Sequence, residues 1–168
     1  AVLLVQPNAI PDATRAALLA LNPSEIVVLG GTGAVSAAVA SQLSAYTAGA
    51  VTRVGGADRY ETAELISQRF FPDGAPVLYV ATGANFPDAL TATPGAGMNN
   101  APLLLVPPTG LTPDLVDEIR RLAPQQIRIL GGIGVVSEAV ELALAEFAPA
   151  PLVAPEDRRY GQDVIVPK

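Results

Sequence analysis

The sequence contains no histidine, no cysteine and no tryptophan, and its only lysine is the last residue, Lys168. Without histidine, the chain lacks the commonest general base and the commonest metal ligand, and every Ser–His or Cys–His nucleophile pair is excluded. Without cysteine, it can form neither disulfides nor thiolate metal sites. Catalysis would have to rest on Asp, Glu, Tyr or Arg, so the composition favours a protein that binds rather than reacts.

Basic clusters and long apolar runs are also missing. The formal net charge is −6, and an acidic chain without a basic run argues against nucleic-acid binding, because neutralising phosphates needs clustered cations. No apolar run approaches bilayer-spanning length, so we expect no membrane insertion. There is no signal peptide, and the chain begins directly on the strand-like AVLLV, so we expect that upstream sequence is missing. No local set of carboxylates suggests a metal, and we expect no cofactor.

The residues that are present indicate one domain's worth of α/β structure. Half of the 168 residues are hydrophobic but only 5% are aromatic, which predicts a core of Ala, Val, Leu and Ile. Apolar runs without polar alternation predict buried strands, and they alternate with segments that begin on helix-capping residues. The sequence therefore predicts parallel sheet layers flanked by helices. We expect strands at 1–5, 26–31, 51–54, 76–82, 102–106 and 127–132, helices at 11–21, 36–47, from 58, after 85, 112–123 and 137–147, and an irregular tail from 149.

An internal repeat organises the chain. When the sequence is shifted by 101 positions, residues 1–50 align with 102–151 at sixteen identical positions, including the pattern LGGxGxVS. We therefore interpret residues 1–50 as the C-terminal half of a first repeat, 51–150 as a complete second repeat and 151–168 as the stub of a third.

The LGGxGxVS pattern follows a strand and opens a helix in both copies, where backbone N–H groups can hold a phosphate. It resembles the dinucleotide pattern GxGxxG, but Ser36 and Ser137 replace the last glycine. A tight strand-to-helix turn is the simpler interpretation. A nucleotide- or phosphate-binding enzyme that uses these turns remains the alternative function.

Two further groups of polar residues have both a structural and a functional interpretation. Asn85 and Asp88 follow a strand, where α/β sheets present ligand groups, but Asp88 also suits the first turn of a helix. Arg53, Arg59 and Tyr60 could recognise an anionic or sugar ligand, since guanidinium groups pair with anions and tyrosine stacks on sugars. The same arginines could instead form an internal network with acidic neighbours that ties one repeat to the next.

Four motifs in order resemble the cell-wall-binding repeat 2 family. They are RVGGADRYETA (53–63), VLYVATGANFPDAL (77–90), APLLLVP (101–107) and IRILGGIGVVSEAV (127–140). In that family the repeats usually occur in threes, attached to amidases, proteases or adhesins of Gram-positive bacteria. The resemblance implies Toprim-like repeats packed around a pseudo-threefold axis, and a non-catalytic role.

The resemblance also implies a ligand, a site and a location. The expected partner is an anionic, teichoic-acid-like polysaccharide, and the expected location is extracellular, in the cell wall. The site implied in the complete repeat is Pro102, Leu103 and Leu104, with Val2, Leu3 and Leu4 in the preceding copy. A repeat-mediated oligomer is a further expectation, and no metal or nucleic acid is expected.

Overall fold

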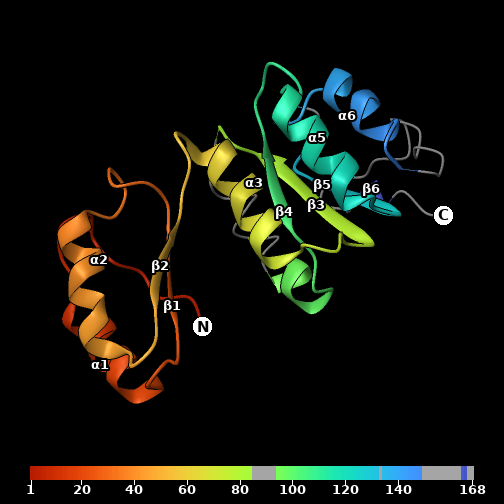
Figure 1. Ribbon diagram of the computed structural model, residues 1–168. Coiled ribbons are helices and arrows are strands. Elements are labelled where there is room, and N and C mark those ends of the chain that lie inside the picture. The colour runs from red at the N-terminus through yellow and green to blue at the C-terminus, as the bar shows by residue number, and fades with distance from the viewer. Residues whose placement is uncertain (85–93, 133, 149–163, 166–168) are drawn as a thin grey trace. The chain divides into compact units, whose positions relative to one another are not determined.

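The structure, a computed structural model, describes residues 1–84, 94–132, 134–148 and 164–165. The chain forms two compact units, Ala1–Ile66 and Ser67–Lys168, each with helices and a sheet (Figure 1). Both sheets are built on parallel pairs, which confirms the α/β class with parallel sheets and helices. The Toprim-like arrangement and the threefold packing stay predictions.

The first unit has a two-stranded parallel sheet. In chain order its elements are α1 (Asp12–Leu21), β1 (Ile26–Leu29), α2 (Ala37–Leu43), the short 3-10 helix η1 (Ser44–Tyr46), β2 (Val51–Val54) and the beginning of α3 (Arg59–Phe70). Strands β1 and β2 pair in parallel from Ile26↔Val51 to Leu29↔Val54. The core is aliphatic, as the composition predicts. Its buried members are Ile10, Leu18, Val28, Val35, Val39 and Leu43.

The second unit contains the larger sheet. After the end of α3 come β3 (Val77–Thr82), β4 (Leu103–Val106), α5 (Pro113–Leu122), β5 (Gln126–Leu130), α6 (Glu138–Ala145) and β6 (Val164–Ile165). The strand order is β4-β3-β5-β6, in which β3 pairs in parallel with both neighbours and β6 is antiparallel to β5. One face of the sheet packs on α5 and α6 through a buried aliphatic cluster (Figure 1).

The helix starts follow the capping signals in the sequence. Ser36 accepts a hydrogen bond from the Val39 N–H at 3.3 Å, and its counterpart Ser137 accepts one from the Val140 N–H at 3.4 Å. These bonds satisfy backbone donors that the first turn of a helix otherwise leaves unpaired. Thr112 caps α5 in the same way. Gly30 and Gly131, the first glycine of each LGGxGxVS turn, both have a positive φ. The two turns therefore leave their strands with a similar backbone conformation.

Two expectations for the ends of the chain are wrong. Residues 1–5 are not a strand, although residues 103–106, which are nearly the same in sequence, form β4. Strand β4 exists because it pairs with β3, whereas residues 1–5 have no such neighbour in the described structure. At the other end, the tail expected to be irregular contributes β6, while 149–163 and 166–168 lie outside the described residues.

Candidate functional site

The glycine turn of the first unit is held by Arg53, which projects from β2. Its guanidinium donates one hydrogen bond to the Gly30 carbonyl at 2.6 Å and another to the Val35 carbonyl at 2.7 Å. These charge-assisted bonds fix both ends of the LGGTGAV turn, and they are stronger than neutral ones. The sequence left two interpretations of Arg53 open, a ligand contact and an internal contact. Its hydrogen bonds match the internal contact, although they go to backbone carbonyls rather than to acidic side chains.

The segment after β2 needs glycine because two backbones meet there. A Cβ on Gly55 would lie 2.3 Å from the carbonyl carbon of Gly30, a distance that no side chain can adopt. The capping box then begins α3: Asp58 Oδ1 accepts the N–H groups of Tyr60 and Glu61 at 2.8 and 3.0 Å. Glu61 Oε2 reaches back to the Ala57 N–H. The RVGGADRYETA motif is thus a strand-to-helix turn packed on the first glycine turn.

The structure brings Arg59 and Tyr60 to the first turn of α3, next to this packed turn. Arg59 is exposed and Tyr60 is half-buried. Asn85 and Asp88 lie outside the described residues, so their placement in a site stays a prediction.

The leucine-rich segment at 102–104 lies mostly inside the protein, whereas in the segment at 2–4 both Val2 and Leu4 are 82% exposed. Pro102 and Leu104 are buried, with Leu104 fully enclosed in the core between the sheet and α5 and α6. Leu103 is half-buried on the opposite face of the sheet. In the first unit, Leu3 packs on the core whereas Leu4 is 82% exposed. Side-chain contact of these segments with a ligand would therefore involve Val2 or Leu4 rather than Leu104.

A polar cluster that the sequence analysis missed lies on the second face of the larger sheet. The Tyr79 hydroxyl accepts hydrogen bonds from Arg128 Nη1 at 2.7 Å and from Asn99 Nδ2 at 2.9 Å. Arg128 also lies over the tyrosine ring, 5.4 Å from its centroid. Tyr79 and Arg128 are direct partners in the β3–β5 register. A polar residue inside each of two apolar strands was the available signal, but sequence alone does not show that these strands pair.

The backbone donors on the helix side of each glycine turn are used within the protein. Ala34 and Val35 both donate to the Gly31 carbonyl, and Ser36 donates to the Pro7 carbonyl at 2.8 Å. In the second copy, Val135 and Val136 both donate to the Gly132 carbonyl. A phosphate-binding turn needs such N–H groups to point at the ligand. These internal bonds therefore favour a structural role for the turns over a phosphate cradle.

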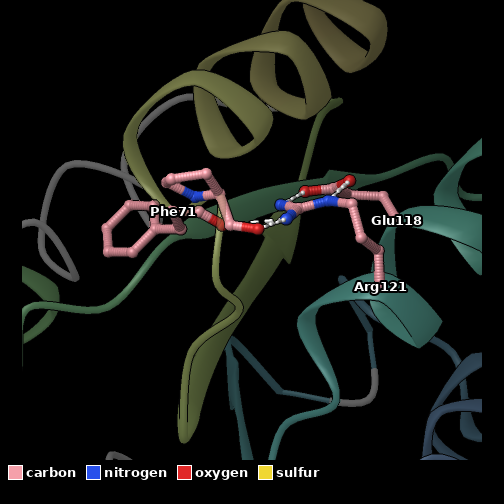
Figure 2. A network of polar contacts seen from close by, with 4 residues as sticks. Phe71, Glu118 and Arg121 are labelled. Atoms are coloured by element: carbon pink, nitrogen blue, oxygen red, sulfur yellow. Dashed lines mark hydrogen bonds and ion pairs between the residues drawn. The ribbon is translucent and has the colours of Figure 1, made fainter.

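An ion pair on α5 also serves the fold. Glu118, whose side chain is 1% exposed, accepts hydrogen bonds from Arg121 Nη2 at 2.7 Å and Nε at 2.8 Å. Arg121 Nη1 donates in turn to the carbonyls of Phe71 and Pro72, which tethers the turn before β3 to α5 (Figure 2). The hydrogen bond to Glu118 raises the pKa of Arg121, against the opposing effect of burial.

Within the residues that the structure describes, no three Asp or Glu side chains gather to hold a metal ion. No described helix combines the length and the apolar character needed to cross a bilayer.

Arg53→Ala is expected to destabilise the first unit by about 2 kcal/mol, because two partly buried backbone carbonyls lose charge-assisted donors. Amide exchange in residues 30–36 should accelerate accordingly. Gln42→Ala is the control, since Gln42 is exposed on α2, and should change the free energy of unfolding by less than about 0.5 kcal/mol. If both variants were equally stable, the role of Arg53 as a tie for the turn would be wrong.

Comparison with known proteins agrees with this picture of a repeat scaffold. The family model named "Cell wall binding domain 2" matches residues 53–141. An uncharacterized protein of Pyrococcus abyssi is 34% identical over 148 residues, covering 86% of this chain and 44% of that protein. The amidase enhancer of Bacillus subtilis is 33% identical over 140 residues, covering 83% of this chain and 18% of that protein.

Among solved structures, Cwp6 from Clostridium difficile superposes with a TM-score of 0.79 at 28% identity, covering 87% of this chain and 23% of that one. The chain thus spans less than half the length of each of these proteins. The family model covers most of the segment interpreted as the complete repeat, from Arg53 into α6. The chain belongs to the cell wall binding domain 2 family.

Proposed function

We propose that the chain is a non-catalytic module that anchors a secreted protein to the Gram-positive cell wall by binding anionic, teichoic-acid-like polymers. The observation that carries this proposal is the match of the wall-binding family model to the complete repeat. The composition supports it, because the chain has no histidine or cysteine with which to build the common nucleophile sites. The module's place of action is then outside the cell, in the wall.

The surface of the module limits how an anionic polymer can bind. A net charge of −6 repels a polyanion at long range, so attraction must come from local cations or from a bridging metal ion. Arg53 and Arg121 are committed to backbone carbonyls and to Glu118. We assign the polymer contacts to exposed residues among those predicted from the sequence, with Arg59 supplying positive charge and Leu4 an apolar surface.

The proposal is tested by sedimenting the full chain with purified Gram-positive walls. One half of the wall preparation is stripped of its anionic polymers by acid and the other half is left intact. We expect the chain to pellet with intact walls, to stay in solution with stripped walls, and to be released by free polymer. Equal retention on both preparations would indicate a peptidoglycan ligand, and no retention on either would reject wall binding.

A further inference from the structure

The polar cluster of Tyr79, Asn99 and Arg128 contains more hydrogen-bond donors than acceptors. The Tyr79 hydroxyl accepts from Arg128 Nη1 at 2.7 Å and from Asn99 Nδ2 at 2.9 Å. Both of these nitrogens can only donate, so neither can accept the hydroxyl proton. Tyr79 is 3% exposed, and its O–H has no acceptor among the residues that the structure describes. Because a buried donor without an acceptor is costly, the hydroxyl requires an oxygen that these residues do not supply.

Gly95 fixes the orientation of the Asn99 amide. Asn99 Nδ2 also donates to the Gly95 carbonyl at 2.8 Å, which only the nitrogen of the amide can do. The amide therefore turns its nitrogen, and not its oxygen, toward Tyr79. Gly95 itself lies against the ring, since a Cβ there would be 3.2 Å from the Tyr79 hydroxyl oxygen. The excess of donors is thus set by the backbone around the hydroxyl.

Arg128 has no counter-ion in the described part of the chain. Its Nη1 donates to Tyr79 and its Nε to Gln126 Oε1 at 3.3 Å, and both partners are neutral. Its Nη2 has no acceptor among these residues, whereas Arg121 forms an ion pair with Glu118. The charge of Arg128 is therefore uncompensated, and its half-buried position reduces screening by water.

The surroundings of Arg128 on the sheet are neutral. Side chains alternate along a strand, so Tyr79, Gln126 and Arg128 share one face of the larger sheet. Tyr79 pairs in register with Leu103 on one side and Arg128 on the other, which places the three in one row. The remaining positions on this face of β3, β4 and β5 are apolar: Val77, Ala81, Leu105 and Leu130. No carboxylate of these three strands therefore competes for the guanidinium.

We propose that Arg128 and the Tyr79 hydroxyl form a binding subsite for a singly charged oxyanion, either a phosphodiester or a carboxylate. Arg128 Nη1 contacts the hydroxyl, so Nη2 of the same planar group lies nearby, and Nη2 and the O–H both donate to the anion. One guanidinium balances one negative charge. The subsite supplies a local cation that a chain of net charge −6 needs in order to hold an anionic ligand. Its assignment to the wall polymer rests on the proposed function.

NMR titration of the full chain with dimethyl phosphate and with acetate tests the subsite without any polymer. The Arg128 Nε–H signal and the backbone amides of residues 79, 99 and 128 should shift and saturate. Sodium chloride at the same ionic strength is the control and should produce no saturable shift there. The same titration with poly(glycerol phosphate) and with polygalacturonate then distinguishes a phosphodiester polymer from a carboxylate polymer as the source of the anion.

Substitutions measure the contribution of each donor. Arg128→Gln should weaken binding of the preferred anion about tenfold, and Tyr79→Phe, which keeps the ring, about fivefold. Arg128→Lys keeps the charge and should bind more tightly than Arg128→Gln. The matched control is Arg120→Gln, which removes the same charge from an exposed pair and should change the affinity by less than about twofold.

The outcomes separate this subsite from the wall-binding proposal. Polymer binding that is unchanged in Arg128→Gln would overturn the subsite and leave wall binding intact. Saturation by dimethyl phosphate at Arg128 without any polymer binding would support the subsite and count against the proposed function. The absence of a saturable shift at Arg128 in the unmodified chain, or an equal shift with chloride, would overturn the subsite whether or not the variants fold.

Discussion

Leu104→Ala is expected to lower the free energy of unfolding of the second unit by about 3 kcal/mol. Leu104 is completely buried, and it packs where β3, β4 and the two covering helices meet. Truncation removes the burial of the side chain and leaves a cavity that a tightly packed core does not close. Urea unfolding, followed by circular dichroism and by amide exchange in β3 and β5, measures the loss.

The repeat supplies a matched control for this prediction. Leu3→Ala removes the same side chain at the corresponding position, but Leu3 is only half-buried at the edge of its core. Its truncation should cost about 1 kcal/mol, because little buried contact is lost. Similar losses at the two positions would contradict the expectation that the difference in burial between Leu104 and Leu3 sets the cost of truncation. Wall retention by folded Leu104→Ala should be unchanged, since its side chain is enclosed.

Arg121→Ala is expected to destabilise the second unit by about 3 kcal/mol. The substitution leaves the Glu118 carboxylate buried without its bidentate partner, and it also unties the Phe71 and Pro72 carbonyls (Figure 2). Removing one member of a buried pair is costly because the remaining charge stays desolvated. The partial exposure of Arg121, whose side chain is 31% exposed, places the effect at the lower end of the usual range. Thermal and urea unfolding measure it.

The neighbouring Arg120 provides the control. Its ion pair with Asp117 spans 3.3 Å, but both side chains are largely exposed, so Arg120→Ala should cost less than about 1 kcal/mol. Arg121→Lys keeps the charge but loses the planar guanidinium group. Its free energy of unfolding should therefore lie between those of the two alanine variants. A cost for Arg121→Ala no larger than that of Arg120→Ala would show that the tether to the turn before β3 contributes little.

The sequence predicted local structure well wherever the signal was carried by neighbouring residues. Ser36, Asp58 and Thr112 cap helices as expected, because a cap depends on residues three or four positions away. The repeat also predicted that both LGG turns are alike. The prediction of a strand at residues 1–5 was wrong for the opposite reason. A strand needs a hydrogen-bonding partner, as β4 has in β3, and an apolar pattern alone cannot show whether such a partner lies beside it.

The candidate site was predictable only in part. The sequence placed Arg53 beside a glycine turn and left open an internal role, but it could not show that the guanidinium binds the carbonyls of Gly30 and Val35. It did not reveal the Tyr79–Arg128 pair, because this depends on the register of two distant strands. Side chains of a leucine-rich strand look equally available in sequence, whereas burial separates Leu104 from Leu4.

Titration of the full chain with purified, soluble anionic wall polymer, followed by calorimetry, tests the central claim most directly. The account predicts saturable binding with the chain and the polymer both recovered unchanged, and weaker binding by Arg59→Ala than by the unmodified chain. It would be contradicted by an absence of binding under conditions where the chain is folded, or by turnover of the polymer.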